Sequence, residues 1–464
     1  MKTVFYFILT LLLFVNCKTQ LAQDTKTIIA ETVETKARPN VILIMADDMG
    51  YETLNINGGN SYRTPNLDRM ALSGMRFNHC YSQPLCTPSR VKIMTGISNV
   101  RNYVKFGVLD TNQITFGNLF EDAGYATCVV GKWQLGKDPK GPQKFGFQEH
   151  CLWQLTEGRI DTVTGNDTRF SEPLLDTNGD LKRHSREEYG PKVVSDYGMD
   201  FIDRSAKVNK PFLLYYPMIL THCPFSPTLD SKSWMTSDSS IAIYKGHPVY
   251  FEDMMSYADK IVGNINSKLE ELGIAENTLV IFTGDNGTDK PIVSYMYGRE
   301  VVGAKGTSPN AGTRVPLIAK WPGKIKAGTT TDELVDFSEM LPTICEAAAV
   351  PLPATPQLDG QSFLPLLKGE SYEPRQWIYN WYSRFGITEK ASVFARTQQY
   401  KLYNDGRFYE IPDDYLEEKP IPKTDLNSET LATYKMLEEV IADYGKRRQE
   451  NIKDKKPGSY VPSR

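Results

Sequence analysis

Strong net charge, long basic runs and internal repeats are all missing from this chain. Its formal net charge is only −3, which argues against nucleic acid as a partner. The apolar run near its N-terminus, Val4 to Val15, is too short to span a bilayer permanently. What the chain does have is length. Its 464 residues, 40% of them hydrophobic, can bury a large core and should form more than one domain.

The first 38 residues are typical of an export segment. Met1-Lys2 precedes the apolar run, and Cys17 follows it directly, before a polar stretch that reaches Arg38. This pattern looks like a bacterial lipoprotein signal, so residues 1–17 are predicted to be an export signal and 18–38 a tether. We expect an exported protein, either in the periplasm or lipid-anchored through Cys17 to the membrane of the bacterial envelope. Asn16 replaces the small residue usual before such a cysteine, so export without lipidation stays open.

Cysteine is scarce and scattered for an exported chain. The chain has seven cysteines, and Cys17 and Cys86 have other expected roles. The remaining odd number leaves at least one cysteine unpaired within the chain. We expect most of them to be buried small hydrophobic side chains. They are Cys80, Cys128, Cys151, Cys223 and Cys345.

Short apolar runs alternate with amphipathic stretches along most of the chain. This alternation predicts an α/β fold with a mostly parallel, buried sheet flanked by helices. Thr64-Pro65 predicts a helix start, and Tyr250 to Leu272 has the apolar spacing of a long helix. The predicted strands of this part are 41–45, 126–130, 211–216 and 278–283.

A domain boundary is predicted near Pro351-Leu352-Pro353, after a helix at about 337–348 and before a linker at 358–369. Beyond it we expect an antiparallel sheet and a helix at about 426–447, with Asn404–Arg407 as a hairpin turn. The expected strands are 377–382, 392–397, 401–403 and 408–411. The chain should therefore consist of a large domain at 39–350 and a small C-terminal subdomain at 351–464.

Acidic and amide residues follow two of the predicted strands. Asp47-Asp48 come after the first strand, and Asp285-Asn286 come after the strand at 278–283. In open α/β sheets, ligands bind beyond the carboxyl ends of the strands. Three carboxylates and one amide oxygen would make an all-oxygen site suited to Ca²⁺ or Mg²⁺ rather than zinc. Each pair alone is equally typical of a cap or a turn.

Two further motifs lie between these pairs. One is Cys86-Thr87-Pro88-Ser89-Arg90, in which Pro88 should open a helix, and the other is Gly131-Lys132-Trp133-Gln134-Leu135-Gly136. The four landmarks in this order resemble the formylglycine-dependent (type I) sulfatases of the alkaline-phosphatase-like superfamily, from about Pro39 to Asp414. The resemblance implies a large N-terminal domain and a small C-terminal domain with an antiparallel sheet. It also implies a sulfuric ester hydrolase.

The resemblance assigns Cys86 as the residue that is oxidised to formylglycine (3-oxoalanine), by a formylglycine-generating or anaerobic maturation enzyme. It assigns Asp47, Asp48, Asp285 and Asn286, with the modified Cys86, as ligands of one calcium ion. The aldehyde hydrates to a geminal diol. One hydroxyl attacks sulfur and displaces the alcohol, and the second expels sulfate when it loses its proton.

The same resemblance gives roles to four more side chains. Arg90 would hold the diol and the metal ligands in place, and Lys132 and Lys305 would bind sulfate oxygens. His222 would be the general acid that protonates the leaving sugar oxygen, a step worth typically 10²–10⁴-fold. A loop lysine or histidine is otherwise just solvated, so these assignments depend on the family match.

Gln134 departs from the family pattern. The family commonly has histidine at this position, two residues after the motif lysine, where it is thought to accept a proton during sulfate release. Glutamine can bind sulfate or the diol but cannot act as a base. Release then uses another base or water, or the chain belongs to a branch that tolerates glutamine, or the enzyme is slow.

The resulting expectation is an exported sulfatase that acts on a sulfated polysaccharide or oligosaccharide. No motif separates algal polysaccharides such as ulvan, carrageenan or fucoidan from host glycosaminoglycans. Substrate selection is expected in 289–299 and 381–386, with Arg299 and Arg384 as candidate readers of a uronate or second sulfate. Three tryptophans are candidates either for sugar stacking or for the core: Trp153, Trp377 and Trp381.

Two alternatives stay open. One is a phosphonate or phosphate-ester hydrolase of the same superfamily, although no ligand set for a second metal ion is visible. The other is a non-catalytic glycan-binding homologue, of which Gln134 would be a sign.

Overall fold

A computed structural model describes residues 38–162, 165–234, 245–412, 414–448 and Ile452. The predicted export signal, the tether and Cys17 lie outside these residues. The described residues from Pro39 onward form one compact unit, and the domain boundary near Pro351 stays a prediction. No helix in the described part of the chain combines the length and the apolar character needed to cross a membrane.

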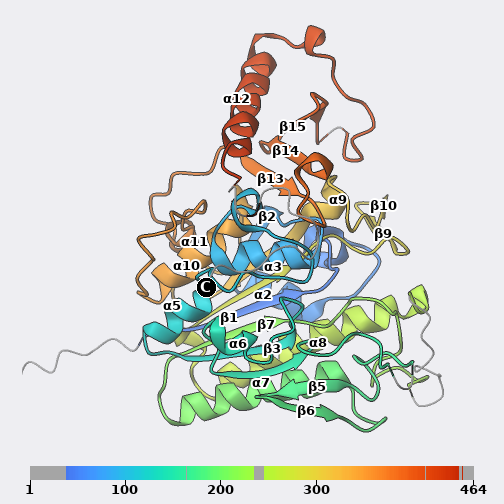
Figure 1. Ribbon diagram of the computed structural model, residues 1–464, viewed down its shortest axis with the longest axis vertical. Coiled ribbons are helices and arrows are strands. Elements are labelled where there is room, and N and C mark those ends of the chain that lie inside the picture. Colours follow the sequence, from blue (N-terminus) through green and yellow to red (C-terminus); the bar gives the residue numbers. More distant parts are fainter. Residues whose placement is uncertain (1–37, 163–164, 235–244, 413, 449–451, 453–464) are drawn as a thin grey trace, which may run out of the picture. The chain divides into compact units, whose positions relative to one another are not determined.

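A ten-stranded mixed sheet lies at the centre of the described chain, in the order β12-β2-β11-β8-β1-β7-β3-β4-β5-β6 (Figure 1). Its middle is parallel, because β1 pairs in parallel with β7 and β8, and β3 with β7 and β4. β11, β5 and β6 run antiparallel to their neighbours. The strands are β1 (Asn40–Ala46), β2 (Met75–Tyr81), β3 (Ala126–Lys132), β4 (Glu149–Trp153), β5 (Leu174–Thr177), β6 (Asp180–Arg183), β7 (Phe212–Pro217), β8 (Thr278–Gly284), β11 (Arg314–Lys320) and β12 (Thr329–Asp336).

Alternate residues of β1 belong to two different hydrophobic clusters. Leu43 packs in one cluster and Ile44 in the other, because successive side chains of a strand point to opposite faces. Helices cover both faces, which is why the central strand is apolar throughout. One face carries α2 (Pro65–Leu72), α7 (Gly190–Lys207) and α8 (Phe251–Glu271), and the other carries α3 (Cys86–Thr95), α5 (Phe116–Asp122), α10 (Met340–Ala347) and α11 (Leu364–Lys368).

The C-terminal part holds a four-stranded antiparallel sheet and a long helix. The strands are β13 (Ile378–Tyr382), β14 (Ser392–Arg396), β15 (Tyr400–Tyr403) and β16 (Phe408–Glu410), paired in chain order, and the helix is α12 (Ser428–Gly445). The predicted fold class is confirmed: a mostly parallel sheet between helices, with a small antiparallel C-terminal sheet.

The prediction of a linker at 358–369 is partly wrong. This segment contains α11, whose Leu364 and Leu367 are buried in the same cluster as Leu43. The backbone N–H of Phe363 also donates to the Thr343 hydroxyl of α10 at 3.0 Å. The segment begins with polar residues, so its sequence did not indicate the short amphipathic helix that packs on the large core.

The remaining elements are short. A hairpin of β9 (Val293–Met296) and β10 (Arg299–Val302) precedes the loop that carries Lys305. The short helices are α4 (Asn99–Asn102), α6 (Gly141–Lys144) and α9 (Asn310–Thr313), and the 3-10 turns are Tyr51–Thr53, Asn55–Asn57, Pro248–Tyr250, Ala275–Asn277, Phe337–Glu339, Thr388–Lys390 and Lys423–Asp425. All six cysteines among the described residues are buried and free of disulfides.

Candidate active site

The two acidic pairs lie side by side at the carboxyl ends of neighbouring strands. β1 and β8 are in register, with Ala46 opposite Gly284, so the residues after each strand meet. The backbone N–H of Asp48 donates to Asp285 Oδ1 at 3.0 Å, and Asn286 Nδ2 donates to Asp48 Oδ1 at 2.8 Å. The sequence prediction that these four residues converge therefore agrees with the geometry.

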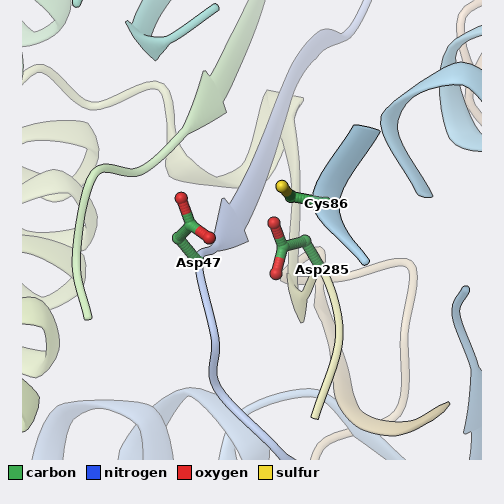
Figure 2. Close-up of side chains that lie close together, drawn as sticks. All are labelled: Asp47, Cys86 and Asp285. Atoms are coloured by element: carbon green, nitrogen blue, oxygen red, sulfur yellow. The ribbon is translucent and has the colours of Figure 1, made fainter. Parts of the chain in front are cut away.

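Cys86 faces this group from the first turn of α3. Figure 2 shows its sulfur and the carboxylates of Asp47 and Asp285 directed into one space, where one ligand atom from each lies within 4.8 Å of the others. Every residue of α3 is buried. Pro88 is the third residue of the helix rather than its opening residue, a position that proline tolerates because first-turn N–H groups have no helical partner.

Arg90 lies one turn further along α3, beneath the carboxylates. Its Nη2 atom is 3.7 Å from both Asp47 Oδ2 and Asp285 Oδ2, and its Nη1 donates to the Lys132 carbonyl. The guanidinium is fully buried, so it offsets part of the negative charge that the acidic residues bring into the core.

Strand β3 delivers Lys132 and the residues after it. Lys132 Nζ donates to Asp47 Oδ2 at 2.6 Å. Gly131 has a φ of +112°, and a Cβ there would lie 2.1 Å from the Pro217 carbonyl of β7, so no larger residue fits before this lysine. Gln134 Oε1 accepts a hydrogen bond from Cys86 Sγ at 2.9 Å.

Two loops complete the group. Lys305 Nζ, after β10, donates to Asp48 Oδ2 at 2.6 Å. His222, after β7, places its Nε2 3.9 Å from the same oxygen. The structure thus brings the predicted catalytic and metal-binding residues of the described chain together, and their individual roles stay predictions.

Arg169 was missed by the sequence analysis. It forms a two-pronged ion pair with Asp167 and donates to the Cys223 carbonyl. Its Nη1 atom also lies 2.9 Å from His222 Nδ1. Because a guanidinium only donates, this contact favours the tautomer with the proton on Nε2, whereas the contact of Nδ1 with the Cys223 carbonyl at 2.6 Å favours the other. No motif marks Asp167 or Arg169, which lie in an irregular segment.

Burial and neighbouring charges shift the pKa values of the two carboxyls that flank Cys86 in opposite directions. Burial raises the pKa of the Asp285 carboxyl well above its usual range, and the Asp47 carboxylate adds to this. Burial acts in the same direction on Asp47, but Lys132 and Arg90 outweigh it and lower the pKa of that carboxyl. A metal cation between Asp47 and Asp285 would stabilise both carboxyls in their charged forms.

Burial favours the uncharged forms of both Cys86 and His222. Burial raises the pKa of the Cys86 thiol, so the thiolate is disfavoured. Burial lowers the pKa of His222 well below 6.5, and Lys305 and Lys132 add to this. A proton donated by His222 must therefore come from a neutral ring or be acquired with the substrate.

The donor set fits a hard divalent cation. Asp47 Oδ1, Asp285 Oδ2 and Asn286 Oδ1 are buried and have no hydrogen-bond partner among the described residues. Buried polar atoms are normally paired, since leaving one unpaired costs about 1–3 kcal/mol. Carboxylate and amide oxygens are the ligands that Ca²⁺ and Mg²⁺ prefer. These three atoms, with Asp48, could hold such an ion.

A pocket of about 340 Å³ opens above this group. The predicted residues that line it are Cys86, Lys132, Gln134, Trp153, His222, Lys305 and Arg384, and they are joined by Leu85, Phe106, Gln154, Arg159 and Arg169. Arg299 lines a different pocket, beside Tyr415. The expectation that Arg299 reads the substrate therefore has no support here, because the hairpin carries it away from Cys86.

The three candidate tryptophans differ in their surroundings. Trp153 lines the pocket, and the Arg169 guanidinium lies 4.7 Å from its ring centre. Trp381 is buried against Tyr103, and Trp377 packs edge-on against Tyr444. Only Trp153 among these three lines this pocket, and it is only 2% exposed.

Comparisons with known proteins agree with this arrangement. A family model described as "Sulfatase" matches residues 39–350, and one described as "N-sulphoglucosamine sulphohydrolase, C-terminal" matches residues 308–442. Human arylsulfatase A is 33% identical over 394 residues, covering 79% of this chain and 74% of the relative. Mouse N-acetylgalactosamine-6-sulfatase is 30% identical over 404 residues, with the same coverage of 79% and 74%.

Among solved structures, Ps i-CgsB in complex with k-i-k-neocarrahexaose superposes with a TM-score of 0.74 at 23% identity, covering 92% of this chain and 95% of that one. This likeness shows a shared fold. Together with the family model, which spans well over half of the chain, and with the two sulfatase relatives, it leads to one conclusion. The chain belongs to the sulfatase family and is a sulfuric ester hydrolase.

Proposed function

We propose that this enzyme hydrolyses sulfate esters of a sulfated carbohydrate, using formylglycine formed from Cys86 and a calcium ion held by Asp47, Asp48, Asp285 and Asn286. One observation carries the proposal. Cys86 begins a buried helix between two carboxylates that have unpaired oxygens, and it faces a pocket lined by cations.

Formylglycine at residue 86 would provide an oxygen nucleophile for sulfur, and the bound cation would provide positive charge beside it. Side chains of the protein itself would bind the sulfate, contact residue 86 and donate the proton. Lys132 and Lys305 line the pocket floor and can hold sulfate oxygens. Gln134 contacts the side chain of residue 86. His222 faces the pocket and is our assignment for the donor to the leaving oxygen.

Arg90 positions this machinery without entering the pocket. It contacts the carboxylates of Asp47 and Asp285 and the carbonyl of Lys132. It therefore links the end of β1, the end of β8 and the end of β3 to the helix that carries Cys86. A fixed arrangement of this kind lowers the cost of orienting the reacting groups.

A carbohydrate substrate is supported by the relatives. Mouse N-acetylgalactosamine-6-sulfatase is named for a sulfated sugar, and Ps i-CgsB was crystallised with k-i-k-neocarrahexaose. The half-buried Phe106 in the pocket adds aromatic surface of the kind that sugar rings pack against. We extend the proposal to oligosaccharides of algal polysaccharides such as ulvan.

The test is sulfate release from a panel of algal and animal sulfated oligosaccharides. The protein is co-expressed with a formylglycine-generating enzyme, and Cys86→Ala is the matched control. We expect calcium-dependent release that vanishes in the control. Peptide mass spectrometry of the segment around residue 86 confirms the aldehyde separately.

Two outcomes would overturn the proposal. Turnover of phosphonate or phosphate esters, with none of sulfate esters, would favour the other hydrolase class. Binding of sulfated glycans without turnover of any ester, with the aldehyde present, would favour a non-catalytic homologue.

We also propose that the enzyme is exported and lipid-anchored through Cys17. Metabolic labelling with a palmitate analogue tests this directly. Label that disappears in Cys17→Ala supports the anchor, and export of unlabelled protein would leave a cleaved signal without lipid.

A further inference from the structure

The pocket above Cys86 is lined by more positive charge than one sulfate needs. Its lining holds two lysines and three arginines and no carboxylate side chain. Lys132 is paired with Asp47 and Lys305 with Asp48. These two lysines, with the proposed cation, suffice for the sulfate that is removed. The arginines are Arg159, Arg169 and Arg384.

Arg169 and Arg384 differ in what already offsets their positive charge. Arg169 forms a buried two-pronged ion pair with Asp167. Arg384 is exposed at the pocket rim, and its guanidinium forms neither an ion pair nor a hydrogen bond with any described residue. Its side chain instead lies over two rings, with the guanidinium carbon 5.0 Å from the Phe106 centre and 5.7 Å from the Phe385 centre.

The backbone of Arg384 is fixed although its side chain is exposed. Its carbonyl accepts hydrogen bonds from the Phe106 N–H at 2.9 Å and the Tyr103 hydroxyl at 3.1 Å. Two residues later Gly386, with a φ of +73°, sits so close to Val104 that a Cβ would lie 1.8 Å from its carbonyl oxygen. The loop after β13 is therefore packed against the segment after α4. The Arg384 side chain extends from a backbone position that these contacts fix.

Stacking on an aromatic ring suits an arginine that must bind an anion. The ring holds the plane of the guanidinium, and the N–H edge stays available for a carboxylate or sulfate in two-pronged geometry. The pocket is near the small end of the range for ligand sites, about 300–1,000 Å³. An anion that reaches Arg384 must then belong to the sulfated sugar itself or to its direct neighbour.

We infer that Arg384 binds a second anionic group of the substrate, so that the enzyme acts on sulfate esters of sugars that also carry a carboxylate or another sulfate. This inference rests on the proposed function. Arg159 adds positive charge on the same lining. A neutral sugar monosulfate would leave the Arg384 guanidinium without an anionic partner.

The experiment compares three substrates that release sulfate from the same ring position. They are a neutral sugar monosulfate, the same sugar with a second sulfate, and the monosulfated sugar linked to a uronic acid. The variant is Arg384→Gln, and the matched control is Lys390→Gln, which removes an exposed cation a few residues away. Circular dichroism and melting curves check that both variants fold.

We expect the mature wild-type enzyme to prefer at least one anionic sugar over the neutral one in kcat/KM. One charge-assisted, two-pronged contact is worth about tenfold to a hundredfold, so Arg384→Gln should reduce the preference by about that factor, mainly through KM. Lys390→Gln should keep the preference. The substrate on which the preference falls identifies the second anion as sulfate or carboxylate.

A wild-type enzyme without preference, or an equal loss on all three substrates in Arg384→Gln, would overturn the inference while leaving a sulfatase. If no substrate is turned over, the proposed function fails, and binding decides the inference. Calorimetry on the Cys86→Ala protein, with and without Arg384→Gln, would then show weaker binding of the anionic sugars only if Arg384 contacts them.

Discussion

The thiol of Cys86 donates a hydrogen bond to the amide oxygen of Gln134 at 2.9 Å. The residue that departs from the usual sulfatase pattern is thus in direct contact with the residue that we expect to be modified. Gln134 has a φ of +52°, in the left-handed region that few side chains adopt. The backbone after β3 turns sharply there and directs the amide at residue 86.

Replacing Gln134 by alanine should lower kcat more than it changes KM. The lost contact is to the reacting residue, and a hydrogen bond of about 1–1.5 kcal/mol corresponds to roughly tenfold in rate. Gln134→His should be faster than Gln134→Ala, because imidazole can accept a proton. Steady-state kinetics on the preferred sulfated oligosaccharide measures both. A wild-type kcat in the alanine variant would show that the contact has no part in turnover.

Calcium should stabilise the fold as well as support activity. Binding to the unpaired oxygens of Asp47, Asp285 and Asn286 favours the native state by about 2.7 kcal/mol at 100 times the Kd. Chelator-treated protein should therefore melt at a lower temperature and recover when calcium is added. Asp285→Asn should lose the response, and Asp196→Asn, at an exposed ion pair, should keep it. An unchanged response in Asp285→Asn would place the ion elsewhere.

A buried ion pair connects α3 to the rest of the core. Lys92 Nζ lies 2.5 Å from Asp336 Oδ2, and both side chains are buried. Burial alone would raise the pKa of Asp336, but Lys92 and Arg375 outweigh it and lower that pKa. Lys92→Met leaves a buried charge without its main partner and should cost about 3–5 kcal/mol.

Urea unfolding tests this expectation. The double variant Lys92→Met with Asp336→Asn should be more stable than Lys92→Met alone, because no charge is then buried unpaired. Lys192→Met, which breaks an exposed pair with Asp196, should cost less than about 1 kcal/mol. Equal losses in the buried and exposed variants would show that the pair does not hold α3.

His79 should make the fold sensitive to acid. Burial lowers its pKa from 6.5 to about 3, and Arg314 and Arg396 add to this. Between pH 3 and 6.5 the unfolded chain binds a proton at His79 that the folded chain does not. Stability is therefore lost as the pH falls through this window, by up to about 1.4 kcal/mol per pH unit.

The variant His79→Gln removes this proton uptake. Its melting temperature should fall less steeply than that of the wild type as the pH is lowered from 6.5 toward 3. His247→Gln, at an exposed position, serves as the control and should follow the wild type. Parallel curves for all three proteins would show that His79 titrates normally in the folded state.

The local sequence was enough for the parts of the fold that depend on apolar runs. The runs that begin at Val41, Ala126, Pro211 and Thr278 correspond to β1, β3, β7 and β8. β2 was missed because Met75–Tyr81 is only partly buried and carries Arg76, Asn78 and His79. β11 was missed as well, although every residue after Arg314 in it is buried. Their strand character comes from pairing with distant segments, which a local pattern does not contain.

By itself the sequence determined which residues we propose for the chemistry, since motifs after strand ends state residue types and their order along the chain. Cys86, the acidic pairs and the motif lysine could all be named from it. Only the tertiary structure decided which of the remaining polar residues join them. Arg169 reaches His222 and Arg384 reaches the pocket rim, while Arg299 lies at another pocket. Loop side chains follow no period, so their partners are set by how the loops pack on the finished sheet.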